Sequence, residues 1–207
     1  MKTLLKSTAL LAVSFAVGLS AWVATPTTIH AQDAACTFPK APDDFEQEEI
    51  DKLYECIKEK LYGGYAKAGH EIGANLQSWK VTQTGIGPSF AGHGNRFLKT
   101  YSNDIAFDEY IKWRDEGEFA LPVGSVLAKA SWKVNKKGEP QRGPLLIMTK
   151  VAKGEADEFG NWLYTGVNGA GKNFKVSQKF CHDCHGAYEH QDFLGYPAEE
   201  VRINAAD

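Results

Sequence analysis

Outside its N-terminal leader the sequence has no long apolar run, because Lys, Asp or Glu interrupts each hydrophobic stretch within a few residues. A membrane-spanning helix needs roughly 20 consecutive apolar residues, so no span is expected there. The leader, 1–31, combines Lys2 and Lys6 with an apolar run over 8–24 and a polar tail that ends at Ala31. This layout predicts a secretory signal peptide cleaved near Ala31, with a retained membrane anchor as the alternative. We expect a periplasmic protein with no stable membrane insertion after leader cleavage.

An excess of basic residues is also missing. The chain has 23 Lys and Arg against 26 Asp and Glu, a formal net charge of −3 at pH 7, and Lys2 and Lys6 leave with the leader. Phosphate backbones need a basic face to bind, so no nucleic-acid partner is expected. Internal repeats, low-complexity tracts and linkers are absent too, which predicts one domain of ordinary size after the leader.

Cysteine is scarce, and the four that are present fall into two pairs. Cys36 and Cys56 are isolated from any motif. Because exported proteins meet an oxidising compartment in which disulfides form, we expect a Cys36–Cys56 disulfide that pins the N-terminal arm to the first helix.

The second pair lies in the segment Cys181-His182-Asp183-Cys184-His185. A Cys-x-x-Cys-His run is the attachment signature of c-type haem. Two thiols three positions apart can form thioethers with the two vinyl groups of one porphyrin edge, and the adjacent histidine can then bind the iron. We predict one covalent haem c held by Cys181 and Cys184, with His185 as the iron ligand.

Two other interpretations of this segment exist. A zinc site would use the two cysteines with two of His182, His185 and His190, but such sites usually add a second cysteine or histidine pair. A thioredoxin-like redox pair would use the cysteines alone, and it normally follows a strand of a βαβ unit. The haem interpretation is preferred because no other cysteine pair is present.

An amphipathic helix is predicted after the N-terminal arm. Apolar side chains recur at helical spacing at Ile50, Leu53, Tyr54, Ile57 and Leu61. Asp44 is a suitable N-cap with Gln47 as its capping-box partner, and Gly63-Gly64 is expected to end the helix.

The middle of the chain has the pattern of a sheet. Residues 126, 128, 130, 132 and 134 are apolar or small and face one way, while Leu127, Lys129, Ser131 and Lys133 face the other. The full prediction is strands at 96–101, 126–134, 144–150 and 162–167, a turn at 135–138, and a helix at 105–116 capped by Asp104. The expected fold class is α+β, a mostly antiparallel β-sheet with flanking helices and a C-terminal haem c attachment motif.

Methionine is nearly absent, and Met148 is the only one left after the leader. A small electron-transfer cytochrome c has its haem motif near the N-terminus and a methionine ligand downstream, whereas no methionine follows Cys184 here. Met148 lies in an apolar strand, which indicates core packing. The four long helices of a cytochrome c′ do not accommodate the predicted strands.

Five segments in order resemble the cytochrome P-460 family, which includes the cytochromes c′-β. They are GHGNRFLKTYSNDIAFDEY, GEFALPVGSVLAKASWKV, GPLLIMTK, FGNWLYTG and FCHDCHGAYEHQDFLGY, between about Trp79 and Tyr196. The resemblance implies a homodimer of antiparallel sheet and helices, with one haem c whose proximal ligand is His185. Together with the leader and the first helix, it predicts a signal peptide (1–31), an N-terminal arm with the amphipathic helix (32–78) and a haem domain (79–207).

The resemblance also implies a role for Lys129. Members of the P-460 type oxidise hydroxylamine and carry a lysine bonded covalently to the haem macrocycle, and the matching position is Lys129 in VGSVLAKASW. From the residues alone, Lys129 would be a solvated lysine on a half-exposed strand; the resemblance places it in the haem pocket. Ala130 stands where the family commonly has an acidic residue, which weakens the case for a cross-link.

The function depends on the iron face opposite His185. The stretch 171–180 contains Phe174, Val176 and Phe180 but no Asp or Glu, which favours an open iron site with apolar and aromatic walls. We therefore expect a mono-haem cytochrome that acts on small nitrogen species, either oxidising hydroxylamine and passing electrons to a partner cytochrome, or binding nitric oxide without being an enzyme. The alternative is a plain electron-transfer cytochrome in which His70 or His93 supplies a second axial ligand.

Overall fold

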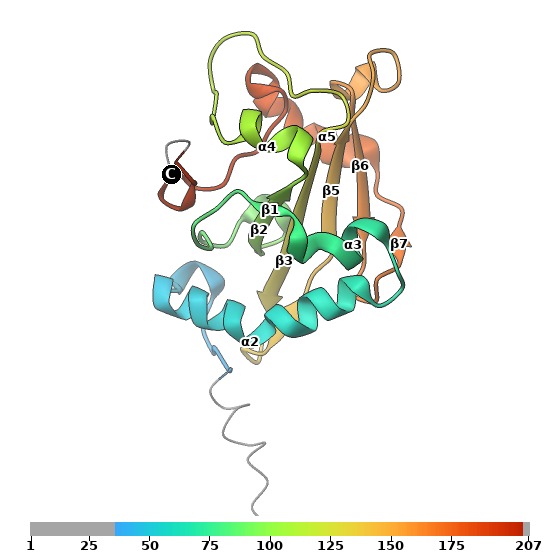
Figure 1. Cartoon of the computed structure of the whole chain (residues 1–207). Helices are drawn as coiled ribbons and strands as arrows, with labels where there is room; N and C mark the ends of the chain where they lie inside the picture. Colours follow the sequence, from blue (N-terminus) through green and yellow to red (C-terminus); the bar gives the residue numbers. More distant parts are fainter. Residues whose placement is uncertain (1–35, 205–207) are drawn as a thin grey trace, which may run out of the picture.

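The computed structural model describes residues 36–204, so the predicted signal peptide lies outside the described residues. A seven-stranded antiparallel sheet forms the centre (Figure 1), with the strand order β1-β2-β3-β5-β6-β7 and with β4 paired to β3. The strands are β1 (Lys80–Val81), β2 (Phe97–Ser102), β3 (Val126–Val134), β4 (Pro140–Arg142), β5 (Leu145–Lys150), β6 (Trp162–Val167) and β7 (Asn173–Phe174). This confirms the predicted α+β class.

Within residues 36–204, four α-helices and several short 3-10 helices surround the sheet. The α-helices are α2 (Gln47–Ala66), α3 (Glu71–Asn75), α4 (Asp104–Tyr110) and α5 (Gln178–His185). The 3-10 helices are η1 (Pro42–Asp44), η2 (Leu76–Ser78), η3 (Ala91–His93), η4 (Asp157–Phe159), η5 (Gly186–Gln191) and η6 (Glu199–Val201). Within residues 36–204 no helix has the length and apolarity needed to cross a membrane.

Two hydrophobic clusters lie on opposite faces of the sheet. Figure 1 shows α2 crossing one face. The buried side chains of α2 belong to one cluster with Ala128, Ala130 and Trp132 of β3. The other cluster contains Leu127 and Met148 together with side chains of α4 and of the segment after α5. The predicted alternation of β3 and the core position of Met148 are therefore confirmed.

The N-terminal end of α2 differs from the prediction. Asp44 is the last residue of the 3-10 helix η1, so it is not available as the N-cap. Glu46 is the N-cap instead, and its backbone N–H donates to the carboxylate of Glu49 at 2.9 Å. Gln47 is thus the first helical residue rather than a capping-box partner.

The other end of α2 also differs, because Gly63 and Gly64 lie inside the helix. A Cβ at Gly64 would lie 2.5 Å from the Arg142 side chain and 2.6 Å from the carbonyl oxygen of Gly169. Glycine at this position therefore permits close packing of α2 against β4 and against the turn between β6 and β7, and it does not end the helix.

The predicted helix at 105–116 is shorter and has a different cap. Asn103, rather than Asp104, is the N-cap, and its side-chain oxygen accepts from Ala106 N at 3.1 Å and from Val126 N at 3.0 Å. The helix ends at Tyr110, and Trp113 has a left-handed φ of 50°. The structure also contains the strand β4, which the sequence does not predict because its three residues are too few and too polar to show alternation.

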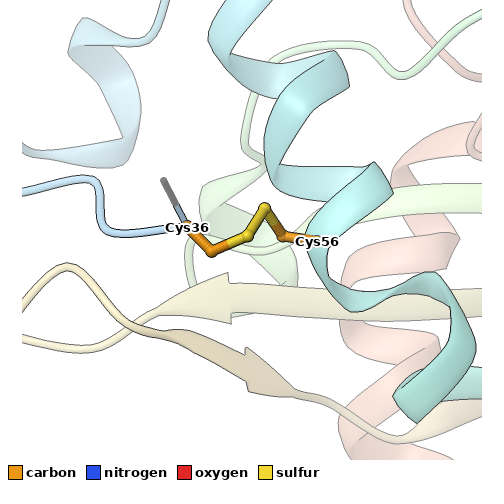
Figure 2. Close-up of a disulfide and its surroundings, with 2 residues drawn as sticks. All are labelled: Cys36 and Cys56. Atoms are coloured by element: carbon orange, nitrogen blue, oxygen red, sulfur yellow. A yellow bond between two sulfur atoms is a disulfide. The ribbon is translucent and has the colours of Figure 1, made fainter. Parts of the chain in front are cut away.

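The predicted Cys36–Cys56 disulfide is confirmed, with the two Cα atoms 5.8 Å apart. Figure 2 shows that it joins the N-terminal arm to α2. The arm is therefore tied covalently to the helix that covers one face of the sheet.

We predict that the double substitution Cys36→Ser and Cys56→Ser lowers the free energy of unfolding by about 3 kcal/mol, because the disulfide no longer restricts the unfolded chain. The disulfide closes a loop between two cysteines that are 20 residues apart in the sequence. Denaturant unfolding followed by tryptophan fluorescence measures the change. An unchanged midpoint and slope would contradict the prediction.

Candidate haem site

Helix α5 presents the two motif cysteines to one cavity. Ser177 caps the helix, its hydroxyl accepting from Phe180 N at 3.2 Å. The Gln178 side chain ties the same end to β6 through two hydrogen bonds with the Tyr164 backbone, at 2.8 and 2.6 Å. Cys181 and Cys184 are both free thiols, and both line a cavity of about 450 Å³.

His185, the last residue of α5, lies at the wall of this cavity with only 9% of its surface exposed. Its Nδ1 is 2.7 Å from the carbonyl oxygen of Phe193. Because a carbonyl can only accept, Nδ1 carries the proton and Nε2 keeps a free lone pair. Burial, with the nearby Lys129 charge as a smaller cause, lowers the pKa of His185 to about 4. A neutral imidazole with a free Nε2 is the form that binds a metal.

The remaining walls of the cavity are mainly apolar. They come from β3, from β5 and from the stretch 174–180, which runs from the end of β7 into α5, through Leu127, Leu146, Ile147, Met148, Phe174, Val176 and Phe180. Among the described residues no Asp or Glu lines it. Its volume is in the usual range for cofactor pockets, and two free thiols with a neutral imidazole are the donors that haem c attachment needs. The residues present therefore fit a covalently attached haem.

Lys129 lies on the same cavity wall and is 9% exposed. Its Nζ donates to the carbonyl oxygen of Gly195 at 2.7 Å, and burial lowers its pKa to about 8. The interpretation from the residues alone, a solvated lysine, was wrong, because the segment after α5 covers this face of β3. The structure brings Lys129 together with Cys184 and His185.

The two histidines proposed as second axial ligands are in different places. His70 is the N-cap of α3, and its Nδ1 accepts from Gly73 N at 3.2 Å, so it has a structural role. The ring centroid of His93 is 6.4 Å from that of His185, with the ring planes 32° apart. Burial lowers the pKa of His93 to about 3, and its buried Nδ1 has no hydrogen-bond partner among the described residues.

A second cavity of about 440 Å³ shares Lys129, His93, Cys184 and His185 with the first. Its other walls are formed by Gln83, the loop at 87–90, Leu98 and Thr100 of β2, Asp183 of α5, Ala187 and Tyr188 of η5, and residues 195–198. Asp183 belongs to the predicted motif, but residue patterns did not identify the other walls, because long-range packing alone brings them to the cavity.

Sequence reasoning also missed the partner of His185, because the Phe193 group that accepts its hydrogen bond is a backbone carbonyl. The zinc interpretation needs at least three ligands in one place. Within residues 36–204, no group of three or more His, Cys, Asp or Glu side chains is arranged to hold a metal ion.

Comparison with known proteins identifies a family for this chain. A family model described as Cytochrome P460 matches residues 74–195, which include α5, β3 and the loop that contains Phe193. A search of curated proteins gives no match. The matched region covers more than half of the chain and contains the haem-attachment motif and Lys129. Membership of this family implies a haem cofactor, and the chain belongs to the cytochrome P460 family.

Proposed function

We propose that this chain, a mono-haem c-type cytochrome by its family, is exported to the periplasm and binds a small nitrogen species, nitric oxide above all, at an open iron site. The observation that supports this is the 450 Å³ cavity that Cys181, Cys184 and His185 line, in which no carboxylate from the described part of the chain takes part. A homodimer and a redox partner cytochrome are part of the same proposal, on the basis of the family resemblance.

The residues of the cavity have different roles in this proposal. The haem, when bound, supplies an iron coordination site and one-electron chemistry. Cys181 and Cys184 would hold it on α5 through thioethers, and His185 would bind the iron through Nε2 because Nδ1 donates to the Phe193 carbonyl. Apolar and aromatic side chains such as Phe174 and Val176 exclude water and larger polar ligands from the cavity. These features support capture of a small, weakly polar ligand.

Hydroxylamine oxidation needs in addition a group that accepts protons. No carboxylate among the described residues lines the 450 Å³ cavity, and Asp183, which lines the second cavity, is ion-paired with Lys179 at 2.7 Å. The depressed pKa of His93, about 3, makes its imidazole a weak base. The position of Lys129 on the cavity wall is the observation that keeps oxidation as a second candidate. We therefore place nitric oxide binding first.

We predict that Cys184→Ala removes most of the covalently bound haem, because one of the two thioether links can no longer form. In-gel staining for covalent haem after denaturation measures this. The matched control is the Cys36→Ser and Cys56→Ser double variant, which removes two cysteines in the disulfide and is expected to keep its haem. Full staining of the Cys184 variant would contradict the attachment proposal.

We predict that the ferrous protein, matured in a periplasm with haem-attachment machinery, gives an ordinary high-spin haem c spectrum and binds nitric oxide. Lys129 Nζ is engaged with the Gly195 carbonyl, and Ala130 departs from the family pattern, so we expect no cross-link. A strongly red-shifted Soret band that returns to the normal position in Lys129→Ala would contradict this and favour hydroxylamine oxidation. Lys133→Ala, on the same strand but half-buried outside the cavity, is the control.

The electron-transfer alternative is favoured by one observation, the 6.4 Å separation of the His93 and His185 ring centroids. If His93 were a second ligand, the ferrous spectrum would be low-spin and insensitive to carbon monoxide. His93→Ala would then convert it to high-spin, whereas His70→Ala, which changes only the cap of α3, would not. We predict instead that His93→Ala leaves the spin state unchanged.

A further inference from the structure

The chain makes a strained corner beside His185. Asp192 and Phe193 follow η5 and have left-handed φ angles of 53° and 62°. This conformation is uncommon for residues other than glycine and is an outlier for a bulky side chain such as phenylalanine. Such strain persists only when the surroundings over-determine the local structure. We therefore expect specific contacts to hold the corner in this conformation.

Asp192 is fixed from three sides. Its carboxylate accepts from Leu121 N at 2.8 Å and pairs with Lys150 Nζ at 2.5 Å, and both side chains of the pair are buried. Its backbone carbonyl accepts from Trp162 Nε1 at 2.9 Å. The three partners come from the loop before β3, from β5 and from β6, so the corner is attached to the rigid sheet.

The Phe193 side chain is held as firmly. A Cβ at Gly160 would lie 2.1 Å from the Phe193 ring, so the ring occupies space that only glycine leaves free. The same ring packs against His182 of the motif, with ring centroids 5.2 Å apart, and Lys150 Nζ also donates to the Gly160 carbonyl at 3.0 Å. With the ring fixed in this way, the Phe193 carbonyl faces His185 Nδ1.

We propose that Asp192 is a positioning residue for the axial ligand. Its contacts with Lys150, Leu121 and Trp162 hold the corner in place. The corner aims the Phe193 carbonyl at His185 Nδ1, and this hydrogen bond tunes the reduction potential of the haem. Hydrogen bonds of this kind fix the tautomer of a ligating histidine and raise its basicity. A more basic axial ligand stabilises the oxidised iron and lowers the potential. The inference rests on the proposed binding of the haem iron by His185.

The test uses two variants of the haem-loaded protein. Trp162→Phe keeps an aromatic ring at position 162 and the charge of the Asp192 carboxylate, but it removes the N–H that donates to the Asp192 backbone carbonyl. Asp192→Asn keeps the side-chain size but removes the charge opposite Lys150. We expect both variants to raise the reduction potential and to lower the iron–histidine stretching frequency of the ferrous form in resonance Raman spectra, because the imidazole becomes less basic.

The control is Asp104→Asn, the same substitution at an exposed carboxylate that pairs with Lys80 on the surface; neither measurement should change. Loss of the buried Asp192 charge can raise the potential by electrostatics alone, so Trp162→Phe is the deciding variant. It also keeps the proposal testable if Asp192→Asn does not fold.

The outcomes are distinct. One contrary outcome is a raised reduction potential in Asp192→Asn with an unchanged iron–histidine stretching frequency, while Trp162→Phe shows no change in either measurement. This outcome would indicate a charge effect only and would overturn the proposal. No change in either variant would overturn it as well. If the wild-type protein has no iron–histidine bond and His185→Ala leaves its spectrum unchanged, the proposed ligation fails, and this inference fails with it.

Discussion

Strand β3 is buried on both faces, and every residue from Leu127 to Trp132 is shielded from solvent. Because successive side chains of a strand point to opposite faces, this one strand serves two compartments. Ala128 and Trp132 complete the core against α2, while Leu127 and Lys129 face the cavity beside α5. A slip of the register by one residue would exchange the two sets. The scaffold and the candidate haem site therefore depend on the same strand pairings.

The sequence predicts best where one physical signal dominates. Strands β3 and β6 have the predicted bounds, Val126–Val134 and Trp162–Val167, because alternation over several residues has no strong competitor. Helix ends are harder, since several acidic residues near the start of α2 compete to be the cap, and Glu46 is favoured only because Asp44 belongs to a preceding turn. The role of Gly64 is also ambiguous in the sequence, because glycine is favoured both where a helix ends and where a helix packs closely against its neighbours.

The candidate site shows a similar division. Cys181, Cys184 and His185 are contiguous in the sequence, so their spacing alone indicates haem attachment. Periodicity places Lys129 on the correct face of β3, but it does not reveal that the chain near Gly195 covers that face. The Phe193 carbonyl cannot be recognised from a residue type at all, because every residue has a carbonyl. Contacts made by backbone atoms and by distant segments need the folded chain.

The Cys36–Cys56 disulfide has a consequence for the sorting of the four thiols. The two cysteines are 20 residues apart and meet on the α2 side of the sheet, so this bond needs only the N-terminal arm and one helix. Cys181 and Cys184 lie on α5 and line the cavity. A short loop closes quickly, which lets the first pair be oxidised while the C-terminal part of the chain is still unfolded. Oxidative maturation and cofactor attachment can then use separate cysteines and proceed in sequence without competing for the same sulfur atoms.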